Sequence, residues 1–111
     1  MKVTIRLTTR GRRSGQPRDA TLYAFEDADR LVVVASVGGA ARDPAWAHNL
    51  RADPRATVRR GGASEEVVAT EVDGPERVRL WALVATEFPL YRTYQARTQR
   101  RIPIFVLSPR P

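Results

Sequence analysis

The chain has 111 residues, enough for one hydrophobic core, and its hydrophobic content of 42% is that of a globular protein rather than a disordered one. It has no cysteine and a single histidine, His48, which excludes a disulfide framework, a multi-histidine metal site and a cysteine nucleophile; we expect no metal. The formal net charge of +7 rests on eighteen arginines and one lysine. This charge favours an anionic partner, although such a composition is equally typical of a GC-rich, actinobacterial-like genome.

No stretch approaches the roughly 18 apolar residues of a membrane-spanning helix. The polar start, Met1-Lys2-Val3, is unlike a signal peptide. We therefore expect a cytoplasmic protein without a membrane span, built as one domain over residues 1–111.

The first predicted element is a hairpin with strands over Val3–Leu7 and Arg18–Glu26. Its connection lies in Thr8–Arg18, which holds two glycines, a serine, a proline and four arginines. Glycine can adopt a positive φ and expose backbone N–H groups, and arginine pairs with phosphate or carboxylate through two hydrogen bonds. These residues alone predict either a solvated turn or a cradle for an anion.

A continuous apolar run, Leu31–Ala35, predicts a strand covered on both faces. It ends at Ser36–Ala40, where two adjacent glycines let the backbone approach a neighbour or a ligand. Asp43 is expected to cap a short helix over Ala45–Arg51, with Pro44 at its first position.

The second half predicts a hairpin over Ala56–Arg60 and Glu65–Val72, turning at Gly61-Gly62. Asp73 is expected to cap the following helix, with Pro75 in its first turn. The apolar face of that helix is predicted to be core: Val78, Trp81, Val84, Ala85 and Phe88.

A second helical piece is predicted over Leu90–Arg100, and a last strand over Ile102–Leu107, with Pro103 at the strand's start or at a sheet edge. We expect Arg97, Arg100 and Arg101 to be solvated. The elements amount to about six strands and two or three helices. They predict a mainly β (α+β) fold, an antiparallel barrel or roll with helical insertions.

Five motifs occur in order along the chain. They are TTxGRRSGxPR at Thr8–Arg18, VASxGGA at Val34–Ala40, PxWxxNLxAxP at Pro44–Pro54, PxYxxYQ at Pro89–Gln95 and RIPI at Arg101–Ile104. Together they resemble the deazaflavin-dependent nitroreductase family, over about Ile5 to Pro109. The resemblance implies a six-stranded antiparallel split β-barrel (β-roll) related to flavin-binding oxidoreductases. It also implies an enzyme that passes a hydride from reduced coenzyme F420, an 8-hydroxy-5-deazaflavin, to a quinone, an enone or a nitroaromatic.

By this resemblance, Arg12, Arg13 and Ser14 would hold the cofactor's phosphate and the start of its oligoglutamate tail. The alternative to a solvated face for Arg97, Arg100 and Arg101 is a second contact for this acidic tail. The deazaflavin ring and ribityl chain would be lined by Arg18, Asp19, Ala20, Thr21, Leu22, Tyr23, Val34, Ala35, Ser36 and Val37. Donors at the start of the short helix would come from Ala45, Trp46, Ala47, His48 and Asn49. The substrate side would hold Tyr23, Phe88, Tyr91 and Tyr94, and the candidate catalytic hydroxyls are those of Ser36, Tyr91 and Tyr94.

Two features differ from the nitro-reducing members of that family. Phe88 stands where they have a further tyrosine, and the chain starts almost at the first strand, where they carry an N-terminal extension with an apolar segment. Three alternatives stay open: an F420-binding carrier without catalysis, a flavin mononucleotide (FMN) protein, and a nucleic-acid-binding protein. The last is disfavoured because aromatic residues are few and the arginines are spread over turns. We expect a small-molecule partner, with monomer or homodimer undecided.

Overall fold

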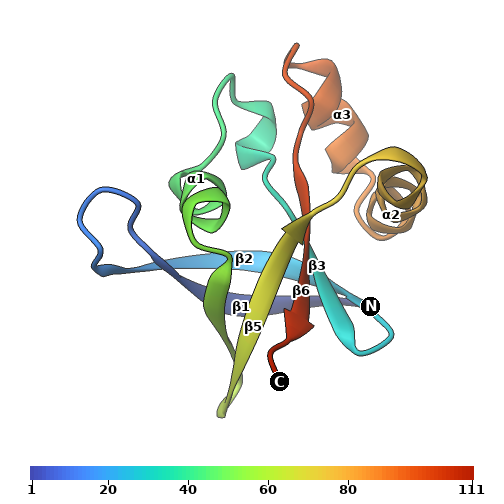
Figure 1. The fold of residues 1–111 in the computed structure, drawn as a ribbon. Coiled ribbons are helices and arrows are strands. Elements are labelled where there is room, and N and C mark those ends of the chain that lie inside the picture. The colour runs from blue at the N-terminus through green and yellow to red at the C-terminus, as the bar shows by residue number, and fades with distance from the viewer.

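Six antiparallel strands form a closed barrel in the computed structural model, which describes residues 1–111 (Figure 1). Around the barrel the strands run in the order β1-β2-β3-β6-β5-β4. Their bounds are β1 Lys2–Arg10, β2 Pro17–Asp27, β3 Arg30–Val34, β4 Arg55–Arg60, β5 Ala63–Glu71 and β6 Ile104–Pro109. The predicted six-stranded antiparallel barrel is thereby confirmed. The helical insertions are the 3₁₀ turn η1 Val37–Gly39 and the helices α1 Ala45–Ala52, α2 Gly74–Glu87 and α3 Leu90–Ala96.

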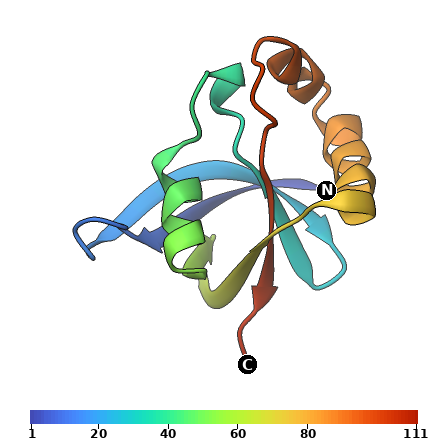
Figure 2. The same ribbon diagram turned by 45° about the horizontal axis from the view of Figure 1, so that its top comes forward.

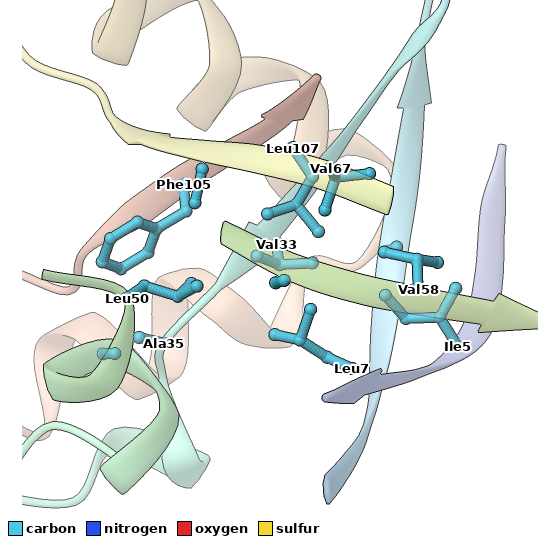
Figure 3. Close-up of a cluster of buried hydrophobic side chains, with 13 residues drawn as sticks. Ile5, Leu7, Val33, Ala35, Leu50, Val58, Val67, Phe105 and Leu107 are labelled. Atoms are coloured by element: carbon cyan, nitrogen blue, oxygen red, sulfur yellow. The ribbon is translucent and has the colours of Figure 1, made fainter. Parts of the chain in front are cut away.

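The barrel interior is made by alternate residues of the strands, as the period of two in the sequence requires. In β1, Ile5 and Leu7 are buried while the residues beside them are more exposed. They meet Val33, Val58 and side chains of β5 and β6 in the core cluster of Figure 3. Leu50 of α1 joins the same cluster, so α1 covers one end of the barrel.

A second core lies on the outside of the sheet, where α2 and α3 cover β2, β3 and β6. Phe25, Val32 and Ile104 pack there against Leu80 and Val84 of α2. Figures 1 and 2 show α2 and α3 on one side of the upper end of the barrel, and η1 and α1 on the other. A site between these two groups of helices is thus framed by η1 and α1 on one side and by α2 and α3 on the other.

Two local predictions about capping and packing are wrong. Asp43 does not cap α1, whose N-cap is Pro44; its carboxylate instead accepts hydrogen bonds from Arg51 (2.8 Å) and Arg100 (2.7 Å). Val78 is 71% exposed, because α2 contacts the barrel through Leu80 and Val84, about half a turn away. Asp73, by contrast, caps α2 as predicted, accepting from the Gly74 N–H at 2.9 Å.

At the end of the chain one prediction needs adjustment, and of the two positions predicted for Pro103 the strand's start is the one found. The helix predicted over Leu90–Arg100 ends at Ala96. Pro103 is not at a sheet edge, since β6 pairs with both β3 and β5. It immediately precedes β6, where its carbonyl accepts from the Ala35 N–H at 2.9 Å. None of the helices combines the length and the apolar character that crossing a membrane would take.

Candidate functional site

A cavity of about 620 Å³ opens between β1 and β2, the η1 segment, the start of α1 and the aromatic residues at and before α3. None of its 12 lining residues is charged: they are Thr4, Thr21, Leu22, Tyr23, Val34, Ser36, Val37, Pro44, Trp46, Phe88, Tyr91 and Tyr94. A cavity of this size and composition suits a flat, uncharged ring system, since apolar walls with a few hydroxyls are typical of cofactor sites.

Tyr91 is the most enclosed of the aromatic lining residues, at 4% exposure. Its ring packs against Phe88 (4.8 Å between centroids), Phe25 (5.8 Å) and Tyr94 (6.2 Å). Desolvation by burial raises the pKa of the Tyr91 phenol above its usual value, so the hydroxyl stays protonated further into the alkaline range than that of a free tyrosine. Because Tyr91 lines the cavity, its hydroxyl is placed to donate a hydrogen bond to a bound molecule.

The β1–β2 connection forms a second, smaller hollow of about 470 Å³. Its shape is set internally: the Gly11 N–H donates to the Gln16 carbonyl at 2.8 Å, and the Gly15 N–H donates to the Gly11 carbonyl at 2.8 Å. The φ of Gly15 is +73°, and a Cβ on Gly11 would lie 2.8 Å from the Ser14 Oγ. The backbone conformation therefore requires glycine at position 15, and a larger residue at position 11 would crowd the turn. We call residues Arg10–Gly15 the cradle.

The cradle holds donors that nothing in the protein uses. The backbone N–H groups of Arg13 and Ser14 make no hydrogen bond within the chain, and Arg10, Arg12 and Arg13 form no ion pair. The one carboxylate that lines the same hollow, that of Asp53, is paired with Arg55 and also feels the charge of Arg10. Eight other arginines do pair with carboxylates: Arg30, Arg51, Arg55, Arg60, Arg79, Arg100, Arg101 and Arg110. Free N–H groups beside unpaired guanidiniums match the oxygens of a phosphate or carboxylate.

Asn49 of α1 holds the cradle in place. Its side chain is buried, at 4% exposure, and both ends of the amide are used. The Oδ1 accepts from the Arg12 N–H at 3.0 Å, and the Nδ2 donates to the Thr9 hydroxyl at 3.0 Å. The amide of Asn49 thus positions the cradle against α1. The same strand carries both sites, because Thr4 lines the apolar cavity and Arg10 lines the cradle, about 20 Å further along β1.

The structure gathers most of the predicted site residues around these two hollows. The apolar cavity takes in Thr21, Leu22, Tyr23, Val34, Ser36, Val37, Trp46, Phe88, Tyr91 and Tyr94, and the cradle takes in Arg12, Arg13 and Ser14. The predicted residues that line neither are Arg18, Asp19, Ala20, Ala35, Ala45, Ala47, His48 and Asn49.

Several of these remaining residues have other contacts. The side chains of Ala35 and Ala47 are fully buried in the barrel core, so only their backbone could meet a ligand. The Asp19 carboxylate accepts from the Thr8 hydroxyl at 2.7 Å, and His48 is half-buried.

Sequence reasoning missed Thr4 and Pro44, which also line the apolar cavity. Thr4 is the cross-strand partner of Tyr23, so pairing the two predicted strands in register would have found it. Phe88, predicted both as core and as a substrate-side residue, packs on Tyr91 and lines the cavity.

A six-stranded antiparallel barrel with an uncharged cavity and a basic cradle on one hairpin places the chain in the class of split-barrel proteins. An FAD-binding protein from Mesorhizobium loti, 15% identical, shares the fold with a TM-score of 0.65 over 98% of this chain and 82% of its own. At that identity the likeness concerns the fold alone.

Closer relatives show the family. The sequence profile of the F420H(2)-dependent quinone reductase family matches residues 1–109. An F420H(2)-dependent quinone reductase of Mycobacterium tuberculosis (strain H37Rv) is 39% identical over 107 residues, covering 94% of this chain and 72% of the relative. The solved structure of an F420-H2-dependent reductase is 34% identical, with a TM-score of 0.86 over 95% of this chain and 93% of that one.

The chain therefore belongs to the F420H(2)-dependent quinone reductase family. It is an F420-dependent oxidoreductase, and coenzyme F420 is its cofactor, as the sequence motifs imply. The site fits this cofactor in two respects: the apolar cavity suits a deazaflavin ring, and the free N–H groups and unpaired arginines of the cradle suit an anionic group.

Proposed function

We propose that the chain reduces a quinone with F420H2, the apolar cavity holding the cofactor's ring and the acceptor, and the cradle holding the cofactor's phosphate. One observation carries the proposal: an uncharged, aromatic cavity and a cluster of unpaired arginines lie along the same hairpin. A quinone is neutral and flat, so it can enter such a cavity without leaving a charge desolvated. The quinone named in the family description and in the relatives' names supports the same acceptor.

The cradle would hold the cofactor through two kinds of donor. The backbone N–H groups of Arg13 and Ser14 are fixed in direction by the hydrogen bonds of the turn, and the Ser14 hydroxyl remains able to donate. The guanidiniums of Arg12 and Arg13 add charge and reach. Because Asn49 fixes the Arg12 backbone, the donors need little rearrangement on binding.

The cavity walls would orient the rings and exclude water. Leu22 and Val34 supply apolar surface from β2 and β3, while Trp46 packs edge-on against Phe105 of the barrel core at 5.8 Å. A ring anchored to the core in this way cannot swing out of the site without disrupting packing. Such walls hold two reacting rings in a fixed relative orientation, which is the main contribution a protein makes to hydride transfer.

Reduction of a quinone to a hydroquinone takes one hydride and one proton. F420H2, when bound, supplies the hydride. The chain's candidates for hydrogen bonding and proton donation at the acceptor oxygen are the hydroxyls of Ser36, Tyr91 and Tyr94, all on the cavity wall. Tyr91 is the candidate with the best-fixed position, because Phe25, Phe88 and Tyr94 pack around its ring in the cavity wall.

The test is steady-state reduction of a water-soluble quinone, an enone and a nitroaromatic by F420H2. We expect the quinone to have the highest kcat/KM, and a higher value for either other acceptor would overturn the proposal. Tyr91→Phe should lower kcat by about 10- to 100-fold with F420 affinity unchanged, because the ring packing is kept and the hydroxyl is lost. The matched control is Tyr23→Phe, at the more exposed rim, with a smaller expected loss. An unchanged kcat in Tyr91→Phe would remove Tyr91 from the mechanism.

The pH dependence gives a second check. Since the folded protein holds the pKa of Tyr91 above the usual value near 10, its proton is retained as the pH rises. We therefore expect the pH profiles of kcat for the wild type and for Tyr91→Phe to have the same shape between about pH 7 and pH 9.5.

A further inference from the structure

The segment Ser36–Pro44 forms one wall of the apolar cavity, through Ser36, Val37 and Pro44. Its own structure is sparse: the Gly39 N–H donates to the Ser36 carbonyl (2.9 Å), and the Ala40 N–H donates to the Val37 carbonyl (3.1 Å). Val37 has a φ of +46°, a left-handed conformation that is costly for a β-branched residue. A strained wall of this kind has to be held in place by contacts from outside the segment.

Arg100, which follows α3, supplies those contacts. Its Nε donates to the Ala40 carbonyl at 2.7 Å, and its Nη2 donates to the Ser36 carbonyl at 2.8 Å. Its Nη1 donates to the Asp43 carboxylate at 2.7 Å. The side chain is only 14% exposed. All three nitrogens of one planar guanidinium thus bind a single segment, two through backbone carbonyls and one through the Asp43 carboxylate. A lysine ammonium cannot reproduce this arrangement. The prediction that Arg100 is solvated is therefore wrong: its guanidinium clamps the Ser36–Pro44 wall inside the protein.

The clamp extends to other elements on both sides. Asp43 also accepts from Arg51 of α1 at 2.8 Å, and Arg51 donates to Glu71 of β5 at 2.8 Å. These bonds connect the wall to the barrel.

On the opposite side, the wall touches α3 directly. A Cβ on Gly39 would lie 2.6 Å from the Tyr94 carbonyl, so the wall and α3 are in close backbone contact. The Gln95 side chain donates to the Arg100 carbonyl at 2.8 Å and so anchors Arg100 to α3. Arg100 therefore joins the Ser36–Val37 wall to the helix that carries Tyr91 and Tyr94.

We propose that Arg100 is a positioning residue: it fixes the Ser36–Pro44 wall relative to Tyr91 and Tyr94 and so sets how tightly the cavity binds the acceptor. The consequence for the acceptor rests on the proposed function. The claim that Arg100 holds the wall does not rest on the proposed function, because the hydrogen bonds that support it lie within the protein. Arg100 itself lines neither the cavity nor the cradle.

The experiment compares Arg100→Met with Arg30→Met, a matched control. Arg30 is also an arginine paired inside the protein, with Asp27 and Glu76, but it lies at the β2–β3 turn and does not line the cavity. Arg42 is exposed within the wall segment, so trypsin cleavage after it reports release of the wall in the cofactor-free protein. We expect cleavage after Arg42 at least about tenfold faster in Arg100→Met than in the wild type and in Arg30→Met.

Kinetics on the same variants give the functional readout. We expect Arg100→Met to raise the KM for the quinone about tenfold with a smaller change in kcat, and Arg30→Met to leave KM within about twofold at a similar loss of Tm. Arg100→Lys can keep only the pairing with Asp43, so its KM and its cleavage rate should fall between those of the wild type and Arg100→Met. If Arg100→Met fails to fold, Arg100→Lys replaces it in both measurements.

The proposal is overturned if cleavage after Arg42 is no faster than in Arg30→Met, or if both variants shift KM alike. Failure of the proposed function looks different. In that case the wild type reduces no quinone, while the trypsin comparison still decides whether Arg100 holds the wall.

Discussion

Arginine has two different roles in this protein, and the contrast is clearest between the cradle and the β2–β3 turn. At the turn, Arg30 and Arg79 both donate to Asp27, and both also reach Glu76. In the cradle, Arg12 and Arg13 have no carboxylate partner. The same side chain therefore contributes to stability in one region and stays available for a ligand in the other. The net charge of +7 matters for function only where it is left unpaired.

The largest effect should come from reversing charge in the cradle. Arg12→Glu with Arg13→Glu should weaken F420 binding by about 100-fold or more, because two favourable contacts become repulsive. Tm should hardly change, since no ion pair within the protein is lost. Fluorescence titration with F420, FMN and flavin adenine dinucleotide (FAD) measures the affinities, with F420 expected to bind most tightly and in a salt-sensitive manner.

The control for that experiment is Arg59→Glu with Arg92→Glu, which makes the same change in net charge at exposed, unpaired positions outside both hollows. If this control weakened binding equally, the effect would be that of net charge rather than of the cradle. Tighter binding of FMN by the wild type would instead contradict the cofactor assignment.

A smaller effect is expected where the cradle meets α1. Asn49→Ala removes two buried hydrogen bonds and leaves the Thr9 hydroxyl without its donor, which should cost about 1–3 kcal/mol in the free energy of unfolding. F420 affinity should fall about tenfold, because the Arg12 backbone is released. Urea unfolding and fluorescence titration measure the two losses. Thr8→Ala, which removes an exposed hydrogen bond to Asp19, is the control and should change neither substantially. Unaltered F420 affinity in Asn49→Ala would separate Asn49 from the cradle's function.

The smallest effect should come from the paired arginines. Hydrogen bonds from Arg79 and Arg30 lower the pKa of Asp27 to about 2. Because the folded pKa lies below the unfolded one, this contribution to stability is present above about pH 4 and is lost as the pH falls towards 2. Asp27→Asn should therefore cost about 1 kcal/mol or less at pH 7, given solvent screening, and nothing near pH 2.

Urea unfolding of Asp27→Asn and the wild type at pH 7 and at low pH measures this difference, and F420 affinity should be the same in both proteins. A loss of F420 affinity in Asp27→Asn would contradict the division between arginines that pair with carboxylates and arginines that bind the cofactor.

Local patterns were sufficient where neighbouring residues decide the structure. The alternation of Ile5 and Leu7 predicts a strand with one buried face, and Asp73 before Gly74 and Pro75 predicts a helix start. The turn around Gly11 and Gly15 follows from glycine's backbone freedom. In each case the determining contacts lie within a few residues, so composition and spacing contain them.

The same rules gave a wrong answer where distant groups compete. Asp43 has the sequence context of a helix cap, but the guanidiniums of Arg51 and Arg100 take its carboxylate. Val78 has the spacing of a core residue, but the barrel meets the other side of α2.

The sequence by itself determined the six strands, the basic turn, the aromatic residues near Pro89 and, through its motifs, the F420-dependent family. The tertiary structure decided which arginines are free and which are paired, since Asp27 and Arg79 are 52 positions apart and meet only in the fold. It also decided that Thr4 reaches the cavity and that Arg100 holds its wall. The physical reason is the same in each case: whether a charged or polar side chain is satisfied depends on every group within a few ångströms of it, and closing the barrel brings together groups that are far apart in the chain.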